Sequence, residues 1–273
     1  QGRRTGSESI AAARTYLVAE FERLKMAPVF PGYAQRFDVS TKLRDGTDFS
    51  AEGFNLVAKV NGTGATDGSP RPALVISAHY DHEGVRGGQI YNGADDNASG
   101  VGALLAIAES YQNKRPAHDT FFVLFDAEEL GLLGAQYFVS EIAGLGSSCV
   151  ALNLNMDMVS RNNENELYMA GSYHAPQLKP LINEVAAKAP VKLLQGHDRP
   201  EDGPQDWTLQ SDHGPFQRAG IPFVYFGVED HPHYHKPSDD FDTVPLDFYV
   251  RAIETIEMTA RHLDRDLGKF SGR

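Results

Sequence analysis

The sequence predicts an α/β fold, a three-layer sandwich in which helices cover both faces of a mixed, mostly parallel sheet. Short runs that are apolar almost throughout are typical of strands covered on both faces. Segments with apolar residues at helical spacing lie between these runs, and this alternation is characteristic of α/β proteins. The 273 residues, 41% of them hydrophobic, suffice for one large core. No linker divides the chain, so we expect a single domain over residues 1–273.

The same patterns place each element in turn. A first helix is expected over 7–26, with Ser7 or Ser9 as its N-cap and Pro28 beyond its end. The expected strands span 54–60, 73–80, 120–126, 149–156 and 222–228. The other expected helices span 98–113, 129–142, 175–189 and 245–267. The polar stretch 195–215 indicates a long loop, and long loops in compact domains are more often functional than idle.

The charge and composition limit the partners. The formal net charge of −12 argues against a nucleic acid or an anionic membrane. No apolar run approaches the roughly 18 residues that indicate a transmembrane helix. Cys149 is the only cysteine, so no disulfide can form within the chain. The sequence opens with Gln1 rather than Met, which favours removal of a leader or tag. We therefore expect neither a nucleic-acid nor a membrane partner.

Acidic residues and histidines gather where the expected strands end. The group comprises His79, Asp81, Asp95, Asp96, Asp126, Glu128, Glu129, Asp157, His231, His233 and His235. Ligands of open α/β sheets bind at the carboxyl ends of the strands, so these side chains are expected to converge. Imidazole and carboxylate together suit zinc, with cobalt and manganese as alternatives. One carboxylate can bridge two ions about 3.5–4 Å apart. The group therefore predicts a site for two divalent cations.

Each of these residues also has a simpler interpretation. The stretch 94-ADDNASG-100 resembles a helix N-cap, because Asp and Asn side chains satisfy the first backbone N–H groups of a helix. One cap accounts for only one of its three polar residues. Glu128 and Glu129 could favour a helix N-terminus, and Asp157 could cap a turn. The joint pattern, rather than any single residue, favours the metal site.

Six motifs, taken in order, resemble those of the M28 family of zinc metallopeptidases. They are 77-SAHYDH-82, 93-GADDNASG-100, 128-EELGLLG-134, 155-NMDM-158, 211-SDHGPF-216 and 233-HYHKPSD-239. The opening 3-RRTGS-7 is also similar to the family's usual start. The family contains secreted bacterial aminopeptidases with two co-catalytic zinc ions. The resemblance implies the zinc-dependent exopeptidase fold, a catalytic domain and two Zn²⁺ ions, with His82 displaced from the family's ligand pattern.

The resemblance also implies a role for each ligand position. His79 and Asp157 would hold one zinc ion, and Glu129 and His235 would hold the other. Asp96 would bridge the two ions. Asp96 is preferred to Asp95 because the family's bridging acid is followed by one residue and then a small-Ser-Gly triplet. His235 is preferred to His231 and His233 because the pattern 237-PSD-239 comes shortly after it.

The catalytic roles follow from the same resemblance. Glu128 would be the general base, taking a proton from the zinc-activated water and passing it to the leaving amine. Asp81 would orient the imidazole of His79. Tyr234 would donate a hydrogen bond to the developing oxyanion, with a packing aromatic as the alternative. Asp212 and His213 of the motif 211-SDH-213 would support the ligands or shape the pocket, and the resemblance assigns them no chemical role.

The first hypothesis for the reaction is an aminopeptidase acting on peptides with a free N-terminus. Glu128 and Asp157 would bind the α-amino group, and the acidic balance of the chain favours a cationic terminus. Four residues are candidates to line the side-chain pocket, although each is equally plausible as a core residue: Met158, Phe216, Tyr225 and Phe226. An apolar pocket would favour Leu, Phe or Met.

Three alternatives stay open. A glutaminyl cyclase shares the fold but uses one zinc ion, and the complete set of five ligands argues against it. Cyclase pockets also tend to be rich in tryptophan, whereas Trp207 is the only tryptophan of this sequence. A carboxypeptidase for acidic C-termini would need a basic cluster, for which only Arg161 and Arg199 are placed. A non-catalytic binding protein is disfavoured because every ligand and the base are present. The oligomeric state stays open with a monomer favoured, and the missing leader and the family's habit favour a secreted or periplasmic bacterial protein.

Overall fold

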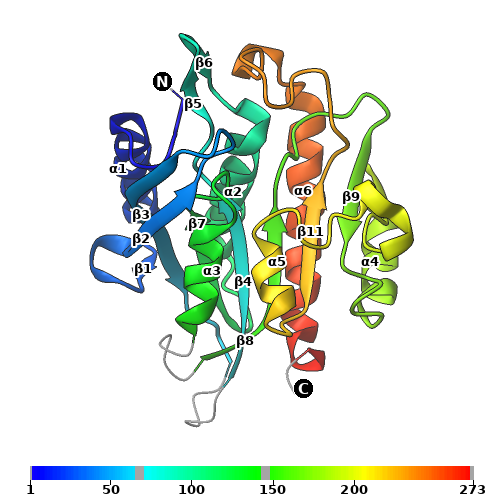
Figure 1. Cartoon of the computed structure of the whole chain (residues 1–273). Helices are drawn as coiled ribbons and strands as arrows, with labels where there is room; N and C mark the ends of the chain where they lie inside the picture. Colours follow the sequence, from blue (N-terminus) through cyan, green and yellow to red (C-terminus); the bar gives the residue numbers. More distant parts are fainter. Residues whose placement is uncertain (1, 65–70, 143–147, 271–273) are drawn as a thin grey trace.

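A nine-stranded sheet runs through the described part of the chain. The computed structural model describes residues 2–64, 71–142 and 148–270, excluding the side chains at 148 and 149 (Figure 1). The strands of this sheet are β1 (Ala27–Pro28), β2 (Ala34–Lys42), β3 (Asp48–Val60), β4 (Arg71–His79), β7 (Asp119–Phe125), β8 (Ser148–Met156), β9 (Glu166–Ala170), β10 (Lys192–Gln195) and β11 (Phe223–Gly227). Their order is β1-β3-β7-β4-β8-β11-β9-β10, with β2 paired to β3.

The strands at the centre of the sheet run parallel. β4 pairs in parallel with β7 and β8, and β11 pairs in parallel with β8. Antiparallel pairs flank them, β3 with β7 on one side and β9 with β11 on the other. Parallel neighbours end at the same edge, so β4, β7, β8 and β11 present their carboxyl ends together. The mixed sheet predicted from the sequence is confirmed.

Helices cover both faces of the sheet (Figure 1). They are α1 (Glu8–Arg23), α2 (Gly100–Asn113), α3 (Leu133–Ser140), α4 (Leu178–Ala186), α5 (His213–Arg218) and α6 (Leu246–Asp266). A separate hairpin joins β5 (Gly84–Arg86) to β6 (Gln89–Tyr91). The short turns are η1 (Pro31–Tyr33), the π turn η2 (Ala94–Ser99), η4 (Pro200–Gln205), η5 (Phe241–Thr243) and η6 (Leu267–Lys269). None of the helices in the described ranges has both the length and the hydropathy needed to cross a membrane.

Successive residues of the central strands enter different cores. In β4, Leu74 and Ile76 pack into the core that contains α1, α2, α4 and α6, whereas Val75 packs into the core under α3 and α5. In β7, Phe122 packs into the first of these cores and Phe121 into the second. Side chains alternate across a strand, so a strand buried on both faces is apolar at nearly every position. This requirement explains the continuous apolar runs of the sequence.

The predicted helices are present with shorter bounds, whereas the strands β3, β4 and β8 begin earlier than predicted. Ser7 is the N-cap of α1, since its Oγ accepts a hydrogen bond from the N–H of Ile10 at 3.2 Å. The structure adds β2, β9 and β10, which are short or alternate between buried and exposed residues. The stretch 195–215, predicted as a loop, contains η4 and the start of α5. The six residues of α5 are too few to show helical periodicity in the sequence.

Candidate metal centre

The five predicted ligands lie together at the carboxyl edge of the sheet. His79 ends β4, and Glu129 and Asp157 follow β7 and β8. Asp96 lies in η2, and His235 lies in the segment between β11 and η5. The chain thus brings five separate segments to one edge, as the strand-end pattern predicted.

Asp96 lies between the two histidines. Its Oδ1 is 3.4 Å from His79 Nε2, and its Oδ2 is 3.0 Å from His235 Nε2. The Nε2 of His79 is also 3.3 Å from Asp157 Oδ1, and that of His235 is 3.6 Å from Glu129 Oε2. Two ligands of one tetrahedral zinc, each bonded at about 2.1 Å, lie about 3.4 Å apart. The spacing therefore suits one ion on each side of Asp96.

The electrostatics of the cluster favour added positive charge. Burial raises the pKa of Glu128 well above its usual value, against the opposing effect of His79. Burial acts to lower the pKa of His79, but Asp157 and Glu128 raise it well above its usual value overall. Burial also opposes ionisation of Asp96, yet hydrogen bonds from His235 and His79 keep its pKa below the usual value. A group of buried carboxylates that stabilises nearby imidazolium suits divalent cations equally well.

Asp81 lies beside both His79 and the turn after β7. Its Oδ1 lies 3.6 Å from His79 Nδ1, and its carbonyl oxygen lies 3.3 Å from the same nitrogen. Its carboxylate accepts hydrogen bonds from the backbone N–H groups of Glu128 at 3.1 Å and Glu129 at 3.3 Å. The sequence predicted only the contact with His79. The structure shows that the same side chain also positions the Glu128–Glu129 turn.

Neither aspartate of the stretch 94-ADDNASG-100 caps α2. The N-cap residue is Ser99, whose side chain makes no capping hydrogen bond. Asn97 Oδ1 instead accepts the N–H of Gly100, the first residue of the helix, at 2.9 Å. The carboxylate of Asp95 accepts hydrogen bonds from the N–H and the hydroxyl of Ser160, and from His231 Nε2 at 2.8 Å. His231 therefore binds Asp95 and does not face the predicted ligands. Asp95 joins η2 to the segments after β8 and β11.

Asp239 is a functional candidate that the sequence analysis treated only as part of a motif. It is fully buried and accepts the N–H groups of Asp95 and Asp96 at 3.0–3.1 Å. Arg161 donates to its Oδ1 at 3.0 Å and to the carbonyl of Asp240 at 3.3 Å. These contacts fix the backbone that carries Asp96. Arg161 thus binds Asp239 and is one of the two cations proposed for a carboxypeptidase site, so that site would lose one of its cations.

The N-terminal segment also supports the centre. Arg3 donates to the carbonyl oxygens of Tyr80 at 2.7 Å and Gly93 at 3.0 Å, which joins the end of β4 to the start of η2. Thr5 donates to Asp126 Oδ1 at 2.7 Å. Burial and Asp81 raise the pKa of Asp126 to about 7. The opening motif of the sequence is therefore part of the framework of the site.

Glu128 and Tyr234 border a cavity of about 320 Å³ over the cluster. Its lining also includes Asp96, Glu129, Asp157 and His235, together with Arg44, Gly131, Leu132, Met158, Leu209 and Gln210. The ring of Tyr234 stacks on that of His235 with centroids 4.0 Å apart. Of the four predicted pocket residues, Met158 lines this cavity, whereas Phe216 and Phe226 are core residues.

Tyr225 contacts the centre in another way. Its hydroxyl donates to the carbonyl oxygen of Asp157 at 3.2 Å, and its ring packs with Trp207. It supports the ligand segment and is not among the residues that line the described cavities.

His82 lies closer to the centre than its position in the motif suggested. It is 1% exposed, and its Nδ1 is 2.7 Å from Glu129 Oε1 and 3.7 Å from Asp96 Oδ2. Although these two atoms of His82 and Glu129 lie 2.7 Å apart, they do not meet in hydrogen-bond geometry, and neither has another hydrogen-bond partner among the described residues. His82, Asp96 and Glu129 form one of the groups that could hold an ion. The sequence signal that could have identified it is a histidine three residues after the predicted ligand His79, just past the end of a buried strand.

Asp212 and His213 lie behind the centre. Both are fully buried, and neither lines the described cavities. His213 Nε2 donates to the carbonyl of Trp207 at 2.8 Å, and burial lowers the pKa of His213 to about 3. Burial raises the pKa of Asp212 well above its usual value, and neither carboxyl oxygen has a hydrogen-bond partner in the described ranges. They support the wall of the site.

Known proteins match this chain in sequence. A model of peptidase family M28 matches residues 55–260. Leupeptin-inactivating enzyme 1 of Streptomyces exfoliatus is 30% identical over 185 residues, which cover 67% of this chain and 37% of that protein. Aminopeptidase YwaD of Bacillus subtilis is 29% identical over 183 residues, covering 63% of this chain and 36% of that protein. The match thus spans little more than a third of the length of these two relatives.

Solved structures share the fold at low identity. A zinc aminopeptidase from Bacillus subtilis superposes with a TM-score of 0.73 at 17% identity, covering 95% of this chain and 90% of that one. A glutaminyl cyclase from Bacteroides thetaiotaomicron superposes with a TM-score of 0.71 at 19% identity, covering 96% and 92%. The fold is therefore common to both activities, and the sequence match decides the family. This chain belongs to peptidase family M28.

Proposed function

We propose that this protein is a metallo-aminopeptidase, a single catalytic domain that uses two zinc ions to remove the N-terminal residue of peptides. The observation that carries the proposal is the position of Asp96, with one oxygen facing His79 and the other facing His235. Such a carboxylate suits two ions better than one. The aminopeptidase relatives within family M28 support the same activity.

In this proposal, His79 and Asp157 hold one ion, Glu129 and His235 hold the other, and Asp96 bridges them. Two zinc ions bound there would lower the pKa of a shared water and polarise the scissile carbonyl. The spacing of the side chains, 3.0–3.6 Å between the nitrogens and carboxylate oxygens, supports this assignment. Asp81 would hold His79 and the Glu128–Glu129 turn in place.

Glu128 would act as the general base. It borders the cavity beside the predicted ligands, so it can accept a proton from the attacking water and deliver it to the leaving amine. Tyr234 borders the same cavity, with its ring held against His235, and its hydroxyl would donate a hydrogen bond to the oxyanion.

The substrate would be a peptide with a free N-terminus. Glu128 and Asp157 line one cavity and would bind the α-amino group. The side chain of the departing residue would contact Leu132, Met158 and Leu209 of the same cavity, which favours an apolar residue such as leucine. In keeping with the secreted aminopeptidases of the family it resembles, the protein would act outside the cytoplasm, and we favour a monomer.

Two other reactions are possible on this fold. The solved relatives include glutaminyl cyclases, so cyclisation of N-terminal glutamine is the second candidate. A carboxypeptidase is less well supported, because Arg161 binds Asp239 and Arg199 lines neither described cavity.

The test uses zinc-loaded protein and four peptides, two starting with Leu or Gln and their two N-acetylated twins. Mass spectrometry follows the products with and without a chelator. The proposal predicts loss of one N-terminal residue from the free peptides, no change in the blocked twins, and no reaction with the chelator. Release of ammonia from the Gln peptide alone would identify a cyclase. Trimming of the blocked twins would identify a carboxypeptidase.

A further inference from the structure

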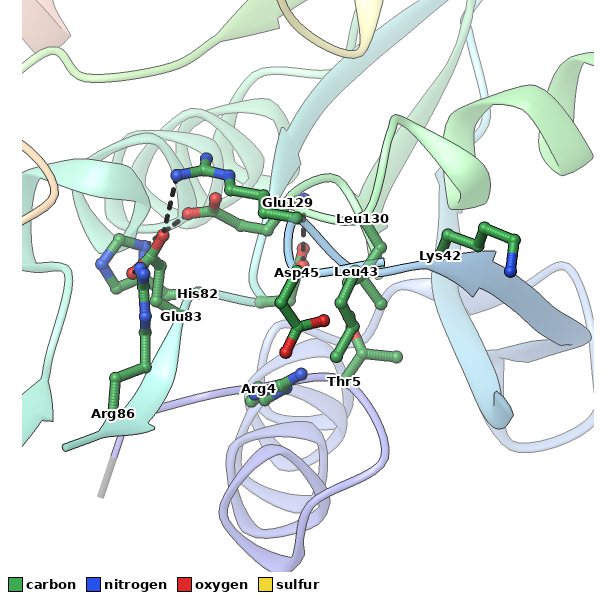
Figure 2. A pocket seen from close by; sticks show the side chains of 12 residues that line it. Arg4, Thr5, Lys42, Leu43, Asp45, His82, Glu83, Arg86, Glu129 and Leu130 are labelled. Atoms are coloured by element: carbon green, nitrogen blue, oxygen red, sulfur yellow. Dashed lines mark hydrogen bonds and ion pairs between the residues drawn. The ribbon is translucent and has the colours of Figure 1, made fainter. Parts of the chain in front are cut away.

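A second cavity, of about 400 Å³, adjoins the metal centre at Glu129 (Figure 2). Its lining consists of Arg4, Thr5, Lys42, Leu43, Arg44, Asp45, Asp81, His82, Glu83, Arg86, Glu129 and Leu130. Figure 2 shows Arg86 on one side of this cavity and Lys42 on the other, with Glu129 beside His82 and Glu83. Arg44 and Glu129 line this cavity as well as the one over the centre. The two cavities are therefore neighbours.

The second cavity gathers four cationic side chains in an acidic protein. Its lining also has four anionic side chains, and two of these, Asp81 and Glu129, belong to the centre. Without these two, the lining has four cationic and two anionic side chains. This excess of two positive charges lies in a chain with a formal net charge of −12. Ions bound at the centre would offset the charge of the acids there. An anionic group of a substrate would thus meet a positive local potential.

Arg44 is the cation of this cavity that also lines the cavity over the centre, and its ion pair is long. Its NH1 lies 3.8 Å from Glu83 Oε1, beyond hydrogen-bond distance, and its side chain is 73% exposed. Arg4 lies over the ring of Phe49 and lines only the second cavity. Arg86 already contacts the same Glu83, and Lys42 lies 2.6 Å from Asp48. The guanidinium of Arg44 can therefore bind a new anion without giving up a close ion pair. A planar guanidinium can also bind a carboxylate through two hydrogen bonds.

The direction of the substrate follows from the proposed function, on which this inference rests. The α-amino group would lie at the Asp157 end of the centre, and Asp157 lines only the first cavity. Glu129, at the other end, lines both. The peptide beyond the scissile bond would then leave toward the second cavity, where Arg44 stands.

We propose that the second cavity is a subsite for a carboxylate on the leaving side of the scissile bond, with Arg44 as its main contact. The carboxylate has two possible sources. It is the C-terminal carboxylate of a dipeptide, or the side chain of Asp or Glu as the second residue of a longer peptide. The subsite makes the enzyme selective for short or acidic leaving groups.

The experiment compares two substrate pairs on zinc-loaded enzyme. Leu-Gly against Leu-Gly-amide tests the terminal carboxylate, and Leu-Glu-amide against Leu-Gln-amide tests the side chain. We expect kcat/KM to favour the charged member of at least one pair by about 5-fold, mostly through KM, which is the size expected for one partly exposed ion pair. Arg44→Gln should abolish this preference and Arg44→Glu should reverse it, each judged from the ratio of the two members of a pair on the same variant.

The matched control is Arg36→Gln. Arg36 lies on β2, is 62% exposed, pairs with Glu52 and is not part of either described cavity. The substitution removes the same charge as Arg44→Gln and should leave the kcat/KM ratios of both peptide pairs unchanged. Because the members of a pair also differ in the basicity of their amino groups, the decisive quantity is the change in ratio between wild type and the Arg44 variants.

The outcomes separate the subsite from the proposed function. A change in the dipeptide ratio alone assigns the terminal carboxylate, and a change in the second ratio alone assigns the acidic side chain. If wild type cleaves all four peptides and Arg44→Gln leaves both ratios as they were, the subsite is wrong and the aminopeptidase stands. If none of the four peptides is cleaved, the proposed function fails and the subsite fails with it.

Discussion

The two cavities that meet at Glu129 are built from different parts of the fold. The first takes its polar residues from segments that directly follow buried strands, such as Asp157 after β8. The second takes its charged residues from exposed turns, with Arg44 after β2 and Arg86 at the end of β5. Residues of the first are held by buried hydrogen bonds, whereas the tips of the second are exposed to solvent.

This difference separates chemistry from selectivity. Metal ligands and a general base must be placed within a fraction of an ångström, which buried strand ends and their hydrogen bonds achieve. A charge that recognises part of a substrate acts over a longer distance and tolerates an exposed turn. Changes at the first cavity should therefore alter turnover or metal binding, and changes at the second should alter substrate preference.

The largest effect is expected for Glu128→Gln. The variant keeps the size of the side chain but cannot accept a proton, so kcat should fall by about 10²–10⁴-fold, the usual contribution of a general base. Both zinc ions should remain. Steady-state kinetics and the metal content of the same sample measure the two quantities. Glu141→Gln, an exposed glutamate after α3, is the control and should keep wild-type turnover.

A smaller effect is expected for Asp239→Asn. Asp239 accepts the backbone N–H groups of Asp95 and Asp96, so its loss loosens η2 rather than removing a ligand. Zinc affinity should fall by about 10–100-fold, as for other groups that support metal ligands. Competition with a chelator measures the affinity. Asp242→Asn, at an exposed site in η5, should leave it unchanged, and equal losses in the two variants would contradict the assigned role of Asp239.

The smallest effect concerns the buried wall behind the first cavity. Burial lowers the pKa of His213 from the usual 6.5 to about 3. As pH falls below 6.5, this histidine is protonated in the unfolded chain but stays neutral in the folded chain. Its contribution to the free energy of unfolding is therefore fully present above pH 6.5 and is lost as pH falls toward about 3. Between pH 7 and 5 this amounts to about 2 kcal/mol.

Replacement of His213 by Gln, which keeps a donor for the carbonyl of Trp207, should remove that part of the pH dependence. Urea unfolding of the metal-free proteins at pH 7 and 5 gives both free energies. The wild type should lose about 2 kcal/mol more than the variant over this interval. Equal losses would show that His213 is not held neutral by burial.

The sequence predicted the parts of the molecule that local pattern determines. Continuous apolar runs marked the central strands because both faces of the sheet are buried. Polar residues after those runs marked the candidate site because parallel strands end at one edge. The ligand assignments needed the family resemblance, since spacing alone did not distinguish His235 from His231, which the structure shows bound to Asp95.

The remaining contacts depend on residues that folding alone brings together. Asp239 binds the N–H of Asp95 from 144 positions away, and no local pattern indicates this contact. Arg44 reaches the centre because the turn after β2 lies beside Glu129. His82 had a signal in its buried strand-end position, but its contact with Glu129 depends on how two strand ends pack. Such long-range contacts required the structure.

The central claim is that Asp96 lies between two zinc ions, and the zinc content per chain tests it most directly. Protein freed of metal is titrated with zinc, freed of excess ion and analysed by mass spectrometry, alongside Asp96→Ala. We predict two ions per chain for wild type, full activity on Leu-Gly-amide only when both are bound, and loss of tight binding at both positions in the variant. One ion per fully active wild-type chain would contradict the account.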